Sequence, residues 1–99
     1  MPNSADQPVR LIAWVHGHVQ GVGFRWWVRT QALQLNLAGS ATNYPDGRVL
    51  VVAEGPRRAA EQLLERLGEQ PSGRERPGDV STVVEQWAEP KGEEGFDRR

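Results

Sequence analysis

Three glycines lie within seven residues near the start of the chain, and they separate two segments with different apolar periods. The preceding residues 10–16 are rich in β-branched and aromatic side chains, which predicts a strand. From Gly23 to about Leu37, apolar residues recur at the helical period, which predicts a helix. Because glycine adopts backbone angles that other residues avoid, residues 17–23 are expected to form a loop between the two.

The remaining segments extend this pattern to a complete small fold. Asp46-Gly47 after Pro45 is typical of a tight turn between two strands. The predicted segments are a strand at 39–44, a turn at 45–47, a strand at 48–54, a helix at 55–68, a connector at 69–78, a strand at 80–87 and a short edge segment at Phe96. The order β, α, β, β, α, β is that of the ferredoxin-like arrangement. We therefore expect an α+β sandwich, a four-stranded antiparallel sheet with two helices on one face.

The chain length limits the number of domains to one. A chain of 99 residues can bury one hydrophobic core and is too short for two. We assign residues 9–99 to this domain and residues 1–8 to a flexible N-terminal tail. The tail does not resemble a signal peptide, and no apolar run approaches the ~20 residues needed to span a bilayer. A cytoplasmic monomer without a membrane partner is expected.

The composition excludes several kinds of chemistry. The sequence has no cysteine, which rules out disulfides, thiolate nucleophiles and iron–sulfur clusters. Its two histidines, His16 and His18, flank Gly17. A protein metal site normally needs three or four converging ligands. We therefore expect no metal and no other cofactor, and we expect both histidines to be structural or exposed to solvent.

The charges are unevenly distributed although the formal net charge is only −1. Residues 8–53 carry a balance of +3, and residues 54–99 carry a balance of −3. A basic N-terminal half fits a phosphate or carboxylate ligand. Its four arginines are too few for a long nucleic-acid footprint, so no nucleic-acid partner is expected.

The glycine loop offers a candidate anion site. Free backbone N–H groups, the positive end of a helix dipole and the Arg25 guanidinium would surround one small volume. The spelling Gly23-Phe24-Arg25 is not that of a Walker loop, and the glycine spacing is not that of a dinucleotide fingerprint. On these residues alone, a structural turn with a surface arginine is the favoured interpretation.

Two segments carry a family resemblance. HGHVQGVGFR at residues 16–25, followed by NYPDGRV at residues 43–49, resembles the two signature segments of the acylphosphatase family. The resemblance is strong from about Arg10 to Gly55 and weak from there to Phe96. It implies a small metal-independent enzyme that hydrolyses the anhydride between a carboxylic acid and phosphoric acid, with acyl phosphate and inorganic phosphate as its small-molecule ligands.

The resemblance also implies roles for individual residues. Arg25 is expected to bind the phosphate, and Asn43 is expected to position the attacking water. Backbone N–H groups of the loop would supply the other phosphate ligands, from Val19, Gln20, Gly21, Val22, Gly23 and Phe24. The chain departs from the family at Ser40, where an aromatic residue is common, and at Leu50, where glutamate is common. Both positions lie outside the expected phosphate site.

Two alternatives to catalysis remain. RNA-recognition domains share this type of fold, but they carry aromatic residues in the third strand, whereas residues 48–53 contain none. The second alternative is a regulatory module that binds phosphate or another small anion without turnover. Retention of both Arg25 and Asn43 argues against it.

Aromatic side chains outside the loop have structural interpretations. We expect the rings of Trp14, Trp27 and Trp87 to lie in the core. A second apolar strip on the first helix is expected to be partly covered by a neighbouring loop or tail, and it consists of Trp26, Leu33 and Leu37.

Overall fold

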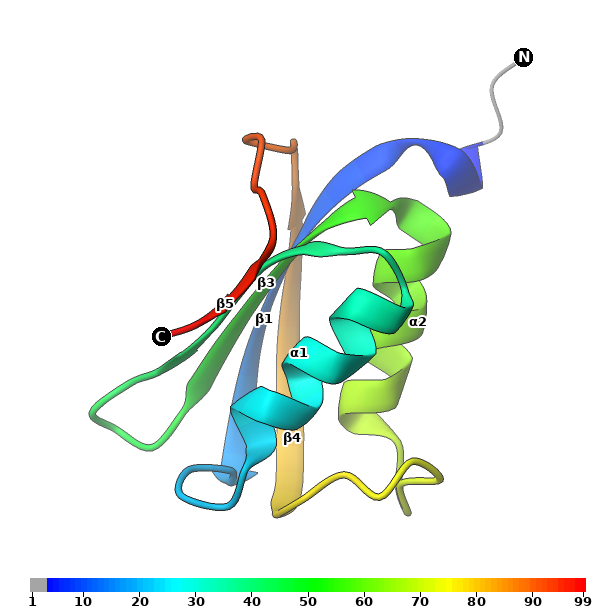
Figure 1. Ribbon diagram of the computed structural model, residues 1–99. Helices are drawn as coiled ribbons and strands as arrows, with labels where there is room; N and C mark the ends of the chain where they lie inside the picture. The colour runs from blue at the N-terminus through cyan, green and yellow to red at the C-terminus, as the bar shows by residue number, and fades with distance from the viewer. Residues whose placement is uncertain (1–3) are drawn as a thin grey trace.

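The computed structural model describes residues 4–99 and shows two helices on one face of a sheet (Figure 1). In chain order the elements are η1 (Ser4–Asp6, a 3₁₀ turn), β1 (Pro8–His18), α1 (Phe24–Gln34), β2 (Ala38–Asn43), β3 (Val49–Pro56), α2 (Arg57–Gly68), β4 (Asp79–Ala88) and β5 (Phe96–Arg98). The expected α+β class and the β-α-β-β-α-β order are confirmed. Neither helix within residues 4–99 is long and apolar enough to cross a membrane.

The sheet has five strands in the order β4-β1-β3-β2-β5, so the prediction of four strands is wrong. The first four are antiparallel, as expected, but β5 runs parallel to β2, with Phe96 opposite Gly39. Main-chain bonds hold it there: the Gly39 N–H donates to the Gly95 carbonyl at 2.8 Å, and the Arg99 N–H donates to the Ala41 carbonyl at 2.7 Å. A strand of three residues is too short to display a two-residue period, so the sequence does not predict its pairing.

The first helix ends earlier than the predicted Leu37. Its last helical residue is Gln34, and Asn36 adopts a positive φ of 58°. The Leu37 N–H then donates to the Ala32 carbonyl at 2.8 Å, which closes the helix end. The turn directs the chain into β2 and buries the Leu37 side chain.

The predicted N-terminal tail overlaps two structured elements. Residues 1–3 lie outside the described residues, but η1 and the start of β1 at Pro8 fall within the predicted tail of residues 1–8. The Arg57 N–H donates to the Gln7 carbonyl at 3.0 Å, which joins this segment to the start of α2. Regular secondary structure therefore begins before residue 9.

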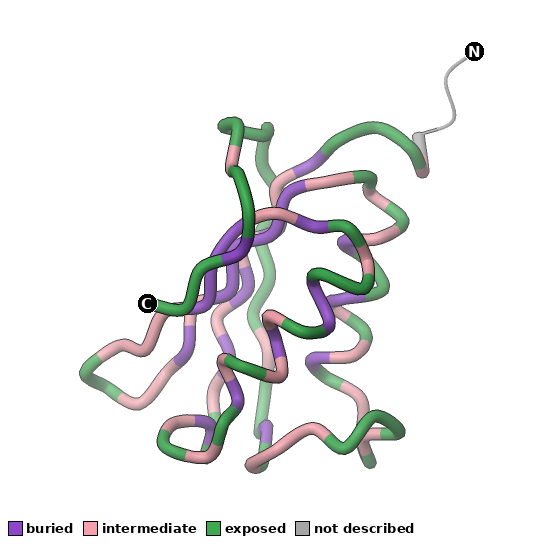
Figure 2. The backbone as a smooth tube through the Cα atoms, in the orientation of Figure 1, coloured by how far each residue is buried: buried purple, intermediate pink, exposed green. Residues whose placement is uncertain are grey.

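The core fills the space between the sheet and the helices (Figure 2). Buried and partly exposed residues alternate along β1, and Leu11, Ala13 and Val15 face the core. The inner face of α2 is apolar and is buried at Leu63 and Leu67. Full burial of a leucine side chain contributes about 1.5–3 kcal/mol, so this contact fixes the helix on the sheet.

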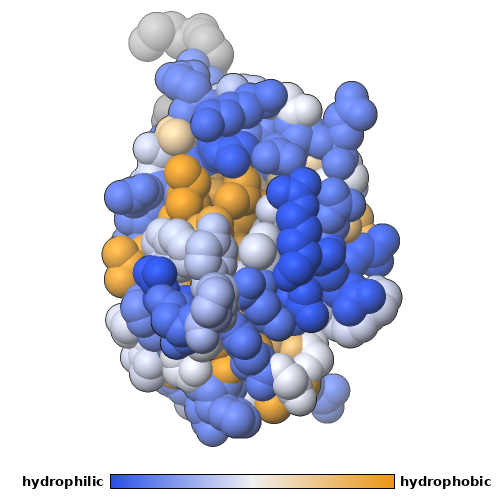
Figure 3. Space-filling view, turned by 90° about the vertical axis from the view of Figure 1, so that its left-hand side faces the viewer, coloured by the Kyte–Doolittle hydropathy of each residue, from blue (hydrophilic) through white to orange (hydrophobic). Residues whose placement is uncertain are grey.

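The tryptophans divide between the two faces of the sheet. Trp27 and Trp87 pack against the core, as expected. Trp14 alternates with the buried residues of β1 and therefore points to the opposite face, so its core assignment is wrong. There its ring makes a T-shaped contact with the Tyr44 ring, with the centroids 4.7 Å apart, and the Arg48 guanidinium carbon lies 4.1 Å from the Trp14 centroid. Seen from the side on which β5 lies, apolar side chains form a patch within a hydrophilic surface (Figure 3).

Candidate active site

The loop between β1 and α1 has a backbone that depends on glycine. Gly21 and Gly23 have φ angles of 73° and 86°, in the left-handed region that other residues rarely adopt. A Cβ atom at either position would meet nothing within 4 Å, so glycine is needed here for its backbone angles and not for space. These angles curl the chain from the end of β1 into the first turn of α1.

Buried side chains and one amide hold the loop in place. Val19 and Phe24 are each only 1% exposed and anchor its two ends in the core. The Gln20 side-chain amide donates to the carbonyls of Tyr44 at 2.8 Å and Arg48 at 3.0 Å. The loop is thus bonded to the turn that joins β2 and β3, although the two are far apart in the sequence.

The adjoining turn is itself braced by a charged pair. Asp46 accepts hydrogen bonds from the backbone N–H of Arg48 at 3.1 Å and from its Nε at 2.6 Å. These bonds, the backbone one first, hold the pKa of the Asp46 carboxyl below its ordinary value. The Gly47 N–H closes the turn on the Tyr44 carbonyl at 3.1 Å. The predicted hairpin is therefore a firm support for the loop.

The N-terminus of α1 faces the same region. Gly23 is its N-cap, and within the described chain no side chain caps it. The first N–H groups of a helix have no intrahelical acceptor, and the helix dipole adds partial positive charge there. Arg25 lies in this first turn. The arrangement favours a small anion in front of the helix.

Arg99 joins the two residues that the family resemblance singled out. The Arg25 Nη1 donates to the Arg99 carbonyl oxygen at 2.5 Å. The backbone N–H of Asn43 donates to the same oxygen at 3.0 Å. One carbonyl thus bridges α1 and β2. Sequence reasoning missed Arg99 because only the apolar Phe96 signalled that this segment returns to the sheet.

The strand that ends just before Arg99 is held by a buried carboxylate upstream. Glu54, on β3, accepts backbone N–H bonds from Lys91 at 2.7 Å, Gly92 at 3.1 Å and Glu93 at 2.9 Å, and it pairs with Arg10 at 2.7 Å. Burial raises the pKa of this carboxyl, but the N–H bonds and the Arg10 guanidinium outweigh burial and lower it to about 2. Glu54 therefore fixes the turn from which the chain enters β5.

The side-chain amide of Asn43 has an unusual environment. Its Oδ1 is buried and has no hydrogen-bond partner among the described residues. Buried acceptors in folded proteins are nearly always paired, so an unpaired one points to a missing ligand or water. Asn43 lines a cavity of about 120 Å³ between the loop, α1, β2 and β5, which we call the loop cavity. Its lining residues are Val19, Gly21, Gly23, Phe24, Arg25, Trp26, Asn43 and Arg98.

The loop cavity brings together most of the predicted site. Arg25, Asn43 and four of the six predicted loop residues line it, whereas Gln20 and Val22 do not. Sequence reasoning assigned no role in the site to Trp26 or Arg98. His16 and His18 are not among its lining residues either. Within residues 4–99, no group of three or more His, Cys, Asp or Glu side chains could hold a metal ion.

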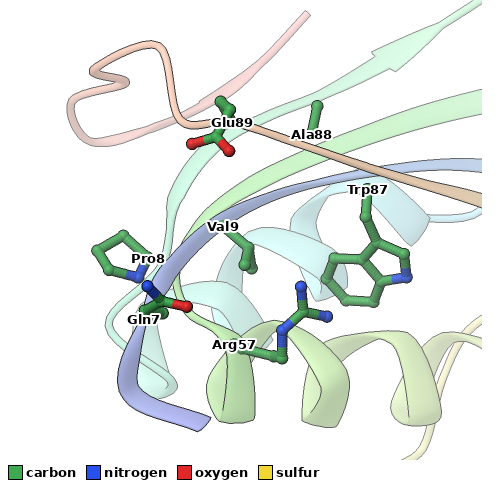
Figure 4. A pocket seen from close by; sticks show the side chains of 7 residues that line it. All are labelled: Gln7, Pro8, Val9, Arg57, Trp87, Ala88 and Glu89. Carbon is green, nitrogen blue, oxygen red and sulfur yellow. The ribbon is translucent and has the colours of Figure 1, made fainter. Parts of the chain in front are cut away.

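A larger cavity of about 440 Å³ lies at the other end of β1 (Figure 4). It is lined by Gln7, Pro8, Val9, Arg57, Trp87, Ala88 and Glu89. At about 3.3 Å per strand residue, Val9 lies roughly 30 Å from the glycine loop. The larger cavity is therefore separate from the site that contains Arg25 and Asn43.

Known proteins share both the sequence and the fold. The family model named Acylphosphatase matches residues 11–98. An acylphosphatase from Corynebacterium efficiens is 69% identical over 91 residues, which make up 92% of each chain. The chain belongs to the acylphosphatase family. The predicted family and its hydrolase class are thereby confirmed.

Solved acylphosphatase structures agree with this assignment. The crystal structure of acylphosphatase from Bacillus subtilis has a TM-score of 0.81 and 32% identity, and the match covers 92% of this chain and 98% of that chain. An acylphosphatase structure from Coxiella burnetii also has a TM-score of 0.81, with 34% identity over 93% of each chain. The acylphosphatase fold thus carries the loop cavity described above.

Proposed function

We propose that this acylphosphatase hydrolyses acyl phosphates in the loop cavity, with Arg25 holding the phosphoryl group and Asn43 positioning the water. The observation that carries the proposal is the buried, unpaired Asn43 Oδ1 in the same small cavity as the Arg25 guanidinium. One group supplies positive charge, and the other supplies a hydrogen-bond acceptor. Together they suit an anionic substrate and a nucleophilic water.

The phosphoryl group would be bound by main-chain and side-chain donors. The loop between Val19 and Phe24 and the uncapped start of α1 present N–H groups, and Arg25 adds a planar fork of donors. The bond from Arg25 Nη1 to the Arg99 carbonyl uses only one of these donors. It fixes the guanidinium before substrate binds, so little side-chain entropy is lost on binding.

Asn43 would act on the water and not on the phosphate. Its amide oxygen accepts a hydrogen bond from water and orients the oxygen lone pair of that water toward phosphorus. An amide cannot take up the proton, so we propose that the proton passes to a phosphate oxygen. The water oxygen forms a bond to phosphorus as the bond to the acyl oxygen breaks, and the electron pair of that bond leaves with the carboxylate. A carboxylate is a weak base, so its departure needs no strong general acid.

The test is hydrolysis of benzoyl phosphate by wild type, Arg25→Ala and Asn43→Ala, all with excess chelator. Asn43 contacts Arg99 through its backbone N–H, so Asn43→Ala removes the amide and keeps the bond between β2 and the C-terminal residue. We expect Asn43→Ala to lower kcat about 10²-fold with an unchanged Ki for inorganic phosphate. Arg25→Ala should lower kcat/KM about 10³-fold and weaken phosphate binding.

Arg58→Gln is the matched control, because it removes one exposed positive charge from α2, outside the loop cavity. Its kinetics should match those of wild type. Full kcat in folded Asn43→Ala would refute the role of the amide. Phosphate binding without turnover in the wild type would favour the alternative, a regulatory module that binds phosphate or another small anion.

We also propose that the enzyme works as a cytoplasmic monomer without a nucleic-acid partner. Burial of Leu37 and the position of Arg98 over the Trp26 ring support a monomer, because they reduce the apolar strip on α1. Leu33 remains 44% exposed. Sedimentation equilibrium at several concentrations tests this, and a mass of two chains would refute it.

A further inference from the structure

Arg98 and Trp26 form a pair at the wall of the loop cavity. The guanidinium carbon of Arg98 lies 3.6 Å from the centroid of the Trp26 ring, well within the range of a cation–π contact. Trp26 is 52% exposed, and both Trp26 and Arg98 line the loop cavity. The two come from different elements, α1 and β5, and meet only in the folded chain.

Among residues 4–99, the Arg98 side chain has neither a hydrogen bond nor an ion pair. The neighbouring carboxylate of Asp97 pairs with Arg99 instead, at 3.3 Å. The nearby Arg29 is also engaged, since its Nε donates to the Phe96 carbonyl at 3.1 Å. Arg98 is therefore a positive charge without a carboxylate partner among the described residues, next to the cavity proposed to bind the phosphoryl group.

Contact with the Trp26 ring orients the Arg98 guanidinium for binding a ligand. Contact with the ring occupies one face of the planar group, while the N–H donors lie in its plane and stay available. The ring also restricts the rotamers of a long, flexible side chain. A guanidinium held in this way loses less entropy when it binds a carboxylate or phosphate oxygen.

The roles proposed for the other cavity residues leave Arg98 and Trp26 free to contact the acyl half of the substrate. The phosphoryl group uses the loop N–H groups and Arg25, and the water uses Asn43. Trp26 and Arg98 are the polar or aromatic lining residues without a task in that scheme. They can offer a flat apolar surface and a cation to whatever is attached to the phosphate.

Resting on the function proposed above, we propose that Arg98, held on Trp26, selects acyl phosphates whose acyl group carries a second anionic group. The indole would contact the carbon skeleton, and the guanidinium would donate to the anionic end. Arg98 is thus a specificity-determining residue of the acylphosphatase site.

The experiment compares benzoyl phosphate with its 3-carboxy and 4-carboxy derivatives, which differ from it only by a carboxylate. We expect wild type to prefer at least one carboxylated isomer about fivefold in kcat/KM, the size of one exposed ion pair. Arg98→Gln should bring that ratio close to one, and Arg98→Lys should keep part of it. The preference should fall with added salt, because the pair is exposed to solvent. Arg58→Gln, which removes an equal charge from α2, should keep the wild-type ratio.

Other outcomes overturn the proposal. The first is that wild type hydrolyses both carboxylated isomers with nearly the same kcat/KM as benzoyl phosphate. The second is that Arg98→Gln, shown by thermal unfolding to be folded, keeps the wild-type ratio of these kcat/KM values. The third is an equal drop in kcat/KM for all three substrates in Arg98→Gln, together with a matching rise in Ki for inorganic phosphate. This result would make Arg98 a phosphate ligand. Failure of the wild type to hydrolyse benzoyl phosphate at all would instead refute the function on which the proposal rests.

Discussion

Replacing Glu54 with Gln tests how a buried carboxylate fixes the turn that leads into β5. Glu54 is 7% exposed, and it accepts three backbone N–H bonds from residues 91–93 and one bond from Arg10. Glutamine keeps the shape and one acceptor oxygen but removes the negative charge. Each carboxylate oxygen accepts two of these bonds, so the substitution removes the negative charge and also leaves one pair of donors facing an NH₂ group.

The expected loss of stability follows from the pKa of the Glu54 carboxyl. A folded-state pKa of about 2 against an ordinary 4.5 corresponds to about 3 kcal/mol at neutral pH, at 1.36 kcal/mol per pKa unit. Arg10 retains its ion pair with Glu93 at 3.0 Å, so its guanidinium is not left unpaired. This remaining pair reduces the loss of stability in the variant. We expect Glu54→Gln to cost about 2 kcal/mol, which lowers Tm by about 8–16 °C in a domain of this size.

The sign of the pH dependence is fixed by the lowered pKa. The stabilisation is complete above the ordinary pKa of 4.5 and is lost as the pH falls through the folded value of about 2. Urea unfolding followed by tryptophan fluorescence at pH 7 and pH 3 measures both states. At pH 3 the difference between wild type and Glu54→Gln should shrink to less than half.

The control is Glu93→Gln, which removes the second and more exposed partner of Arg10 but leaves the backbone bond from residue 93 to Glu54. It should cost about 0.5 kcal/mol at neutral pH. Equal stability of Glu54→Gln and wild type at pH 7 would refute the reasoning. So would a difference of the same size at both pH values, because the charge would then not be its source.

Three further predictions concern the loop, the end of α2 and the histidines. Gly17→Ala should cost about 3 kcal/mol in urea unfolding, because its Cβ would lie 2.1 Å from a carbonyl oxygen of β4. Gly23→Ala has open space at its Cβ and should cost about 1 kcal/mol. Equal losses of stability in the two variants would contradict the difference in crowding between the two glycines. Arg76→Ala removes bonds to three carbonyls at the end of α2, at 3.1, 2.9 and 2.8 Å, and should cost about 1.5 kcal/mol in the same assay; unchanged stability would argue against this brace. The double variant His16→Gln, His18→Gln should keep a flat kcat between pH 6 and 8 with benzoyl phosphate; a rate that follows an ionisation near 6.5 in the wild type and disappears in the variant would implicate a histidine.

Local patterns in the sequence were sufficient for most of the secondary structure. The Pro45-Asp46-Gly47 turn needs only its own residues, because proline and glycine set the backbone angles there. The apolar stripe of α2 likewise follows from its helical period. The end of α1 was placed too late, since the positive φ of Asn36 depends on how the chain turns into β2. The core assignment of Trp14 is wrong because the composition of the strand does not reveal which face of β1 this residue occupies.

The candidate site was only partly predictable. The glycine string and Arg25 lie close together in the sequence, and the family resemblance added Asn43. Gln20 was expected to contribute its backbone N–H, yet its side chain also bonds to the hairpin. No local signal indicated that Arg98 would lie on Trp26.

The sequence by itself determined the glycine-dependent loop, the hairpin turn and the positive charge of Arg25, because each depends on residues that are close in the chain. Only the tertiary structure decided that β5 pairs with β2 and that the Arg99 carbonyl bridges Arg25 and Asn43. It also decided that the Asn43 Oδ1 is buried without a partner. The first two features depend on contacts to main-chain groups of segments more than fifty residues away, and backbone groups are the same in every residue. Local sequence patterns therefore do not reveal which of them will meet.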